Sequence, residues 1–280
     1  MVNIPYDDVY DLAKLTLLVY EYGKSFTLHE NQTIEGFVQS TRSVDNDMTD
    51  LRKEIIGELS TSSPHGRVVE FYSIDKTDLQ VGITISETHK RICVVFRGSE
   101  SKYDWYYDLS FMKRQLHDDV YVHSGFYNQL HTDEACDTLK SKLFELIKEY
   151  PDYSVYITGH SLGGALCTLF GYELSREIQN PITVVSFASP RVGNPAFRKA
   201  FDNTPHLSHY RVSNEHDIVT AAPMINYQHV GTNISLKEDT YEVFQNYSYN
   251  TWYRYSLFKC YSISEHYMDE YIERLRKVIW

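Results

Sequence analysis

The sequence has few of the residues and segments that would assign it at once to a special class of protein. Its 280 residues include four cysteines, far apart at positions 93, 136, 167 and 260. This spacing lacks the close pairs typical of metal ligands, so we expect buried thiols and no metal centre. No apolar stretch approaches the roughly 18 residues that a membrane-spanning helix needs. These shortages exclude a transmembrane protein and leave a globular domain as the expected class.

Positive charge is also scarce. Lys and Arg total 27 against 38 Asp and Glu, which gives a formal net charge of −11. Such a charge repels polyanions, so it argues against nucleic acid or an anionic bilayer as an electrostatic partner.

The N-terminus shows no basic segment followed by an apolar core. Asp7, Asp8 and Asp11 instead precede a modest apolar run at Leu15–Tyr20. We therefore recognise no signal peptide, and we predict a cytoplasmic, reduced protein, with export by another route left open.

The composition indicates one large domain. Hydrophobic residues make up 42% and charged residues 23%, as in ordinary soluble proteins. We expect residues 1–280 to form a single domain, in which residues 1–64 are an N-terminal helical and wrapping extension. Residues 6–22 have helical periodicity, whereas residues 23–64 hold too few apolar residues for a core of their own.

The most informative stretch runs from Tyr153 to Leu166. It predicts a strand, a tight turn at Gly159-His160-Ser161-Leu162-Gly163, and a helix. A G-x-S-x-G turn in this setting is a nucleophile elbow, which pushes the serine hydroxyl clear of the sheet. The alternative is a glycine-rich structural turn that contains a serine by chance. Because the strand–turn–helix context is met in full, we predict that Ser161 is a nucleophile.

Strands and helices alternate along much of the chain. We predict strands at 68–74, 79–85, 92–96, 154–158, 182–187 and 209–213, and helices at 48–59, 132–150 and 265–279. The alternation after residue 120 predicts an α/β protein with a mainly parallel central sheet flanked by helices. Catalytic groups of such sheets gather at the carboxyl ends of the strands, where Ser161 and Asp217 both stand.

Residues 101–112 hold an unusual density of aromatic side chains between charges. A partly buried surface loop would explain them, but so would a mobile lid whose apolar face covers a cleft. For the lid and for substrate binding, we name Tyr103, Trp105, Tyr106, Tyr107, Phe111 and Met112.

Several separated motifs resemble those of the class 3 lipase family, the α/β-hydrolases that include fungal triacylglycerol lipases and plant sn-1 acyl hydrolases. They appear in family order across roughly residues 67–270. The motifs are residues 95–99 (VFRGS), 104–109 (DWYYDL), 122–126 (VHSGF), 159–165 (GHSLGGA), 189–194 (SPRVGN) with Phe197, 214–217 (NEHD) and 229–231 (HVG). The resemblance implies an α/β-hydrolase fold with an aromatic lid.

The resemblance also implies roles at the matching positions. Ser161 would be the nucleophile and Asp217 the acid that orients the histidine, in the chain order Ser…Asp…His of this fold. Both His229 and His266 follow Asp217; His266 matches the late histidine-plus-aromatic site, and we favour it as the base. The oxyanion hole would use the backbone N–H of Leu162 and the N–H and hydroxyl of Ser99.

The expected function is hydrolysis of glycerolipid acyl esters through an acyl-serine intermediate, without a cofactor or metal. Phospholipase A1, diacylglycerol lipase and feruloyl-type esterase activities stay open within the same fold, as does acyl transfer. An inactive lipase-like binding or scaffold protein is the alternative from another class. The expected partner is a lipid or other acyl-ester substrate, with transient contact of the lid at a lipid interface.

Overall fold

The computed structural model describes residues 3–22, 33, 34, 36, 49–61, 66–74, 76–98, 112–245 and 262–280. Its strands are β1 (Arg67–Ile74), β2 (Leu79–Ser86), β3 (Arg91–Phe96), β4 (Lys113–His117), β5 (Val120–His123), β6 (Ser154–His160), β7 (Ile182–Phe187), β8 (Leu207–Asn214), β9 (Thr232–Leu236) and β10 (Tyr241–Phe244). Its α-helices are α1 (Tyr6–Tyr22), α3 (Asp50–Thr61), α5 (Ser124–Leu130), α6 (Ala135–Glu149), α7 (Leu162–Ser175), α8 (Pro195–Asp202) and α10 (Met268–Lys277). Short 3₁₀-helices lie at Thr132–Glu134, Val219–Ala221 and Ser264–His266.

Eight strands form one sheet in the order β1-β2-β3-β6-β7-β8-β9-β10. The neighbours from β3 to β9 pair in parallel, and antiparallel strands close both edges. Strands β3, β6 and β7 are almost entirely buried, as expected for parallel strands covered on both faces. The predicted mainly parallel sheet of an α/β-hydrolase is confirmed.

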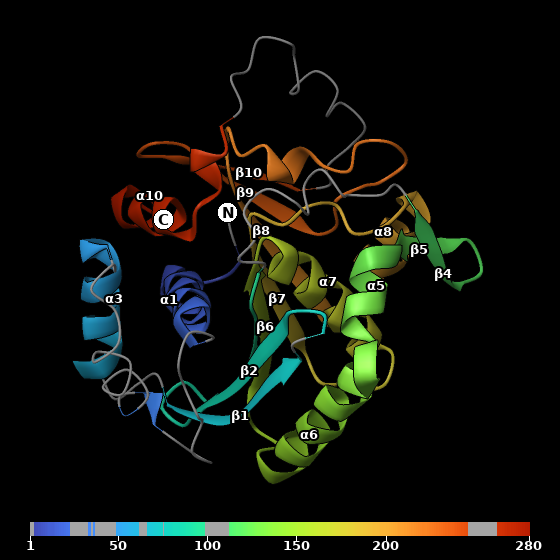
Figure 1. Ribbon diagram of the computed structural model, residues 1–280, viewed down its shortest axis with the longest axis horizontal. Coiled ribbons are helices and arrows are strands. Elements are labelled where there is room, and N and C mark those ends of the chain that lie inside the picture. Colours follow the sequence, from blue (N-terminus) through green and yellow to red (C-terminus); the bar gives the residue numbers. More distant parts are fainter. Residues whose placement is uncertain are drawn as a thin grey trace.

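Two apolar layers cover the sheet. One layer packs α5, α6, α7 and α8 against one face, and the other packs α1, α3 and α10 against the opposite face. Figure 1 shows these two groups of helices on either side of the strands. Helix α7 is buried almost all round, because it lies between the sheet and α5. This helix begins at the predicted elbow, so its position is fixed by the most deeply packed part of the molecule.

Helix α1 belongs to the core of the sheet rather than to a separate unit. Leu12 and Leu17 are fully buried, and Thr16 Oγ1 lies 3.2 Å from Thr158 Oγ1 in β6. Helix α3 is joined to α10 by ion pairs, in which Arg52 contacts Asp269, and Arg276 contacts Glu54 and Glu58. The N-terminal helices therefore support the same sheet face that carries α10.

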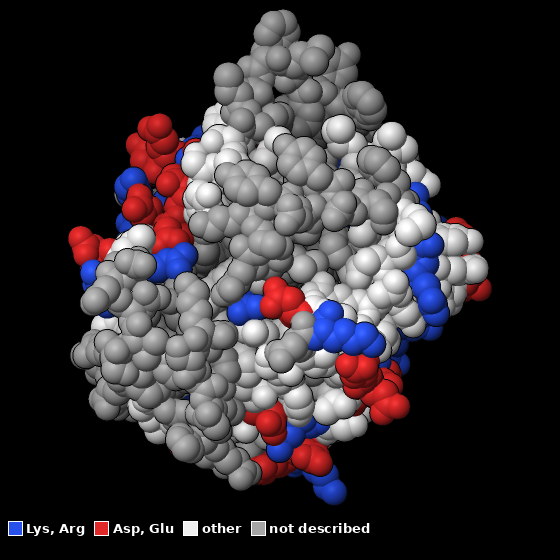
Figure 2. Space-filling view, viewed as in Figure 1, with Lys and Arg blue, Asp and Glu red and all other residues white. Residues whose placement is uncertain are grey.

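The predicted helices and strands agree closely with those observed, but some elements were missed. From the sequence we did not predict the β4–β5 hairpin, α5, α8 or the β9–β10 pair. On the face shown in Figure 2, the described Lys and Arg side chains lie among Asp and Glu rather than in one patch of a single sign. Among the described residues, no helix combines the length and apolar character needed to cross a bilayer.

Candidate active site

The turn between β6 and α7 holds Ser161 in a strained backbone conformation. Its φ is 59° and its ψ is −123°, a region that residues with a Cβ rarely adopt. A Cβ at Gly159 would overlap the backbone of Gly163, and a Cβ at Gly163 would overlap the backbone of Phe96. The two motif glycines are thus required because β3, the turn and the first turn of α7 approach too closely for side chains. This geometry is that of a nucleophile elbow.

Ser161, His266 and Asp217 form a continuous hydrogen-bonded chain. His266 Nε2 lies 2.8 Å from Ser161 Oγ, and His266 Nδ1 lies 3.1 and 3.0 Å from the two carboxylate oxygens of Asp217. Asp217 is fully buried, whereas the side chain of His266 is 12% exposed. The two ring nitrogens of His266 thus contact different partners, Nδ1 the carboxylate and Nε2 the serine hydroxyl.

The histidine is held by contacts of the segment around it. Asn214 Nδ2, at the end of β8, donates to the Glu265 carbonyl oxygen (2.8 Å), and Ser262 N–H donates to the His216 carbonyl oxygen (3.0 Å). These bonds fasten the segment before α10 to the strand end that carries Asp217. His266 and Asp217, 49 residues apart in sequence, are therefore held together by the fold.

A tyrosine of α10, which was not singled out from the sequence, completes the surroundings of Asp217. Tyr271 Oη donates to Asp217 Oδ2 (2.7 Å) and accepts the N–H of Asn214 (2.9 Å), while the N–H of Val219 donates to Asp217 Oδ1 (2.9 Å). Burial and the Asp217 charge raise the pKa of Tyr271 well above 10. The phenol therefore stays protonated and remains a hydrogen-bond donor to the carboxylate.

Tyr271→Phe should lower stability and turnover without removing either. The change takes one donor from a buried carboxylate and one acceptor from a buried N–H, which costs about 1.5–3 kcal/mol of unfolding free energy. We expect kcat to fall about tenfold with KM nearly unchanged, because the lost bond orients Asp217 rather than substrate.

Denaturant unfolding and steady-state ester kinetics check this prediction. Tyr227→Phe is the matched control, since Tyr227 is also buried but donates to the Met112 carbonyl oxygen (3.2 Å). An equal loss of kcat in both variants would contradict the positioning role of Tyr271.

His160, the second residue of the elbow motif, supports the site through a hydrogen bond to the backbone of His266. Its Nε2 lies 2.7 Å from the His266 carbonyl oxygen, so this nitrogen must donate, and its Nδ1 accepts from Tyr20 Oη at 2.7 Å. Burial, with a contribution from His266, lowers the pKa of His160 to about 3. His160 is therefore neutral and links α1 to the backbone of His266. His160 is evident in the elbow motif, but no local sequence pattern predicts its contact with the His266 backbone.

Of the two predicted oxyanion-hole residues, Leu162 is among the described residues and Ser99 is not. Leu162 is the first residue of α7, where N–H groups have no partner within the helix. Ser99 lies outside the described residues, as do the lid candidates Tyr103, Trp105, Tyr106, Tyr107 and Phe111. A Cβ on Gly98, just before Ser99, would overlap Tyr20 Oη and approach the His160 carbonyl oxygen to 2.6 Å. The segment that leads to Ser99 therefore runs close against the site.

Two further sequence candidates can be placed. Met112, at the end of the predicted lid, has an exposed side chain (67%), and its carbonyl oxygen accepts from the N–H of Ser124. His229, the other candidate base, is buried, with Nε2 2.8 Å from the Thr220 carbonyl oxygen. Burial, then the charges of Arg211 and Arg191, lower its pKa well below 6.5. Of the two histidines, it is His266 that the structure brings against Ser161 and Asp217.

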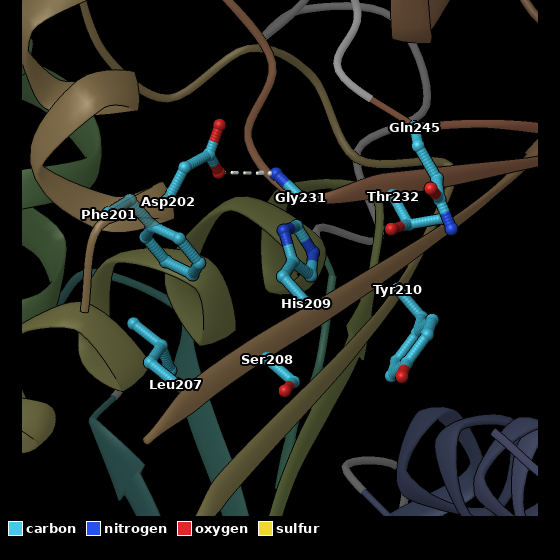
Figure 3. A pocket seen from close by; sticks show the side chains of 9 residues that line it. All are labelled: Phe201, Asp202, Leu207, Ser208, His209, Tyr210, Gly231, Thr232 and Gln245. Atoms are coloured by element: carbon cyan, nitrogen blue, oxygen red, sulfur yellow. Dashed lines mark hydrogen bonds between the residues drawn. The ribbon is translucent and has the colours of Figure 1, made fainter. Parts of the chain in front are cut away.

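A cavity at the first half of β8 lies apart from the candidate site. Its lining includes Leu207–Tyr210 from the first half of β8, together with Phe201, Asp202, Gly231, Thr232 and Gln245 (Figure 3). Asp217 follows the other end of β8, so residues 211–214 of the strand, about 13 Å of extended chain, separate the cavity lining from the turn that carries the carboxylate. The cavity is therefore not part of the Ser161 site.

Comparison with protein families gives a match to the lipase (class 3) family over residues 93–227. This region includes the elbow and ends after Asp217. The resemblance to the class 3 lipase family is therefore confirmed over this region.

Curated relatives of this chain include lipases and a phospholipase. It is 30% identical over 187 residues to a lipase of Rhizomucor miehei (64% of this chain, 51% of that protein). It is 31% identical over 183 residues to phospholipase A1-II 3 of Oryza sativa subsp. indica (55% and 44%). A third relative, secreted mono- and diacylglycerol lipase A of Penicillium cyclopium, is 31% identical over 160 residues (55% and 50%). The chain thus spans about half the length of the curated relatives it matches.

The fold agrees with that of a solved fungal lipase. The crystal structure of a lipase from Rhizopus microsporus var. chinensis superimposes with a TM-score of 0.73, at 24% identity, over 96% of this chain and 88% of that one. At this identity the likeness supports the fold.

The predicted cytoplasmic location is wrong. The Penicillium relative is a secreted enzyme by its name, which conflicts with that expectation. The prediction depended on the lack of a recognised signal at the N-terminus, and the lack of one local pattern does not determine where a folded hydrolase works.

Proposed function

We propose that this chain is a serine carboxylic ester hydrolase, specifically a lipase that cleaves acyl esters of glycerolipids. The observation that carries the proposal is the hydrogen-bonded chain from Ser161 Oγ through His266 to the buried Asp217. A serine hydroxyl is a weak nucleophile unless a positioned base takes its proton, and here the base and its orienting carboxylate are both in reach.

In the proposed reaction, Ser161 Oγ attacks the ester carbonyl carbon while His266 Nε2 takes the hydroxyl proton. The tetrahedral intermediate collapses when His266 returns that proton to the leaving alkoxide oxygen, which departs as the alcohol and leaves an acyl-serine. Water then attacks the acyl carbon with His266 again as base, and release of Ser161 yields the free acid. Asp217 keeps the imidazole in the required tautomer and stabilises its cationic form.

The negative oxygen of the tetrahedral intermediate needs donors that are already in place. We propose the backbone N–H of Leu162, favoured by the start of α7, as one of them. The second would be Ser99, through its N–H and hydroxyl. The aromatic segment that ends at Met112 would form the lid. The chemistry of this site needs no metal or organic cofactor.

The site and the relatives favour glycerolipids as the substrate class. Relatives of similar identity are named as a lipase, a phospholipase A1 and a mono- and diacylglycerol lipase. Their common substrate feature is an acyl ester on glycerol, and this is the class we assign. The alternative, an inactive scaffold, gives no reason for Ser161, His266 and Asp217 to remain within hydrogen-bond distance.

We further propose that residues 1–280 work as one domain, with residues 1–64 as an N-terminal extension. Support comes from α1, whose Tyr20 reaches His160 next to Ser161, and from the shared apolar layer of α1, α3 and α10. Removing the extension would therefore remove a contact of the site itself.

An ester series tests the proposed activity. The purified chain should hydrolyse nitrophenyl esters from acetyl to palmitoyl, with Ser161→Ala as the blank, in the presence and absence of a lipid emulsion. We expect a preference for long acyl chains and a higher rate at the emulsion surface. An apolar lid would open at a lower free-energy cost against lipid than in water.

Each other outcome has a distinct meaning. Short-chain preference without surface activation would make the chain an esterase, and preference for phosphatidylcholine or feruloyl esters over triacylglycerol would change the substrate class. No hydrolysis of any ester by the folded protein would contradict the enzyme and favour a scaffold.

A further inference from the structure

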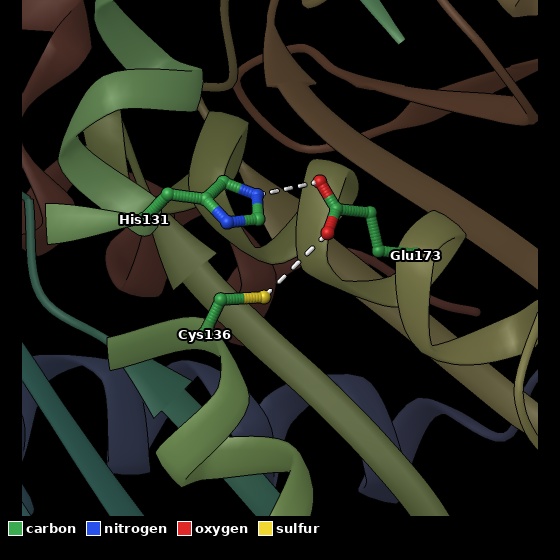
Figure 4. Close-up of side chains that lie close together, drawn as sticks. All are labelled: His131, Cys136 and Glu173. Carbon is green, nitrogen blue, oxygen red and sulfur yellow. Dashed lines mark hydrogen bonds and ion pairs between the residues drawn. The ribbon is translucent and has the colours of Figure 1, made fainter. Parts of the chain in front are cut away.

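Three potential metal ligands meet away from Ser161, where α5, α6 and α7 come together (Figure 4). His131 directly follows α5, Cys136 lies in the first turn of α6, and Glu173 lies near the end of α7. His131 Nε2 is 3.0 Å from Glu173 Oε1, and Cys136 Sγ is 3.6 Å from Glu173 Oε2. All three ligand atoms lie within 4.8 Å of one another.

We propose that His131, Cys136 and Glu173 bind a zinc ion. An imidazole nitrogen, a thiolate and a carboxylate are the ligand types that Zn²⁺ takes, with water in the fourth tetrahedral position. Tetrahedral zinc bonds place a sulfur and a nitrogen ligand roughly 3.6 Å apart, so side-chain rotations of about an ångström suffice to close the site. From the sequence we expected no metal centre, because the four cysteines lie far apart along the chain.

The connection between α5 and α6 is built in a way that suits such a site. Asp133 and Glu134 are consecutive residues with positive φ, of 50° and 60°. Left-handed conformations are costly for residues other than glycine and persist where the surrounding structure holds them. Here they lie at the kink between α5 and α6, and the side chains of His131 and Cys136 point toward Glu173 in Figure 4. The His131 ring is also stacked on Tyr127, with ring centroids 4.1 Å apart.

The charges around the cluster balance when the ion is present. Lys140 Nζ lies 3.5 Å from Glu173 Oε2 and 2.6 Å from Glu177 Oε1. Two carboxylates and one thiolate carry three negative charges, and Lys140 with a divalent ion carries three positive charges. Without an ion, burial and the neighbouring Glu173 carboxylate raise the pKa of the Cys136 thiol, which then stays protonated. Zinc binding must therefore release that proton and compete with Lys140 for Glu173.

The distance of the cluster from Ser161 indicates that a bound ion would have a structural role rather than a catalytic one. Glu173 is 12 residues after Ser161, about 18 Å along the axis of α7. The side chain of His131 is 26% exposed and that of Glu173 is 14% exposed, so an ion can enter from the His131 side. A bound ion would fasten α7, the helix that starts at the elbow, to the α5–α6 connection.

Cobalt titration of the full chain, stripped of metal with a chelator, tests the site without any measure of activity. We expect one Co²⁺ per chain, with a thiolate-to-cobalt absorption band and the visible bands of a tetrahedral ion, and displacement of the cobalt by Zn²⁺. Cys136→Ser should lose the thiolate band. Cys93→Ser is the matched control, because Cys93 is also a buried free thiol but lies in β3.

A second pair of variants distinguishes a metal site from a cluster that is held together by hydrogen bonds and ion pairs alone. Glu173→Gln should weaken cobalt binding, whereas Lys140→Met should strengthen it about tenfold by removing a competing cation. Zn²⁺ should raise the Tm of the wild type and of Cys93→Ser but not that of Cys136→Ser. If Cys136→Ser fails to fold, Glu173→Gln and Lys140→Met decide the question. A thiolate band absent from the folded wild type, retained in Cys136→Ser, or insensitive to both of the other variants would overturn the proposal.

Discussion

Ser161→Ala is expected to lower kcat for ester hydrolysis by about 10⁶-fold, to the level left by binding and oxyanion donors alone. The alanine removes the only atom of this residue that can form the acyl intermediate. It keeps the Cβ, so the strained φ of 59° and the close approach of Gly159 and Gly163 are unaffected. KM should change little, since the hydroxyl is lost as a nucleophile rather than as a binding group. Steady-state kinetics on a nitrophenyl ester measure both values.

Ser186→Ala is a closely matched control for that experiment. Ser186 is buried in β7, next to β6, and its Oγ also lies 2.8 Å from a histidine nitrogen, Nε2 of His209. Burial lowers the pKa of His209 to about 3, so this Ser–His pair is a neutral hydrogen bond away from Asp217. Losing it should cost about 1 kcal/mol of stability and leave kcat within a few-fold. Unchanged hydrolysis in Ser161→Ala, or equal losses of kcat in both variants, would contradict the assignment of Ser161 as the nucleophile.

The elbow could be predicted from sequence because it is a local structure. Gly159 and Gly163 are separated by four positions, and the packing that requires them follows from a strand, a tight turn and a helix in succession. The alternating apolar residues of β2 and the apolar run of β3 are equally local signals. The β4 sequence Lys113–His117 has no alternation of apolar and polar residues, and its burial pattern is mixed, so nothing local marks it as a strand.

The support around the elbow could not be predicted in the same way. Tyr271 is buried in α10, a helix that was predicted from the sequence, but its bond to Asp217 depends on how α10 packs against the end of β8. The contacts of His160 join α1 to the segment before α10, which are separated by most of the chain. The same limit applies to His131, Cys136 and Glu173, which come from three helical segments. Tertiary packing, rather than residue pattern, brings these groups together.

His266→Ala is expected to reduce kcat by about as much as Ser161→Ala, because the two residues act as one unit. His229→Gln is the matched comparison: a Gln amide can still donate to the Thr220 carbonyl oxygen that His229 Nε2 contacts at 2.8 Å. We expect this variant to keep most of its activity. A loss near 10⁶-fold in His229→Gln, with activity retained in His266→Ala, would exchange the roles of the two histidines.

The double variant Ser161→Ala/His266→Ala makes the test independent of any general loss of folding. If His266 acts only by taking the proton of Ser161, nothing remains for it to activate once the hydroxyl is gone, and the double variant should be no slower than either single variant. Two independent contributions would instead multiply to a far larger loss. Unfolding measurements should place His266→Ala and the double variant below Ser161→Ala by about 1.5–3 kcal/mol, because the buried Asp217 carboxylate loses the donor at His266 Nδ1. The backbone of this segment keeps its bonds to Asn214 and to His160, so we expect all three variants to fold. Equal rates in the three variants would therefore assign the base through its coupling to the nucleophile, which proximity alone cannot do.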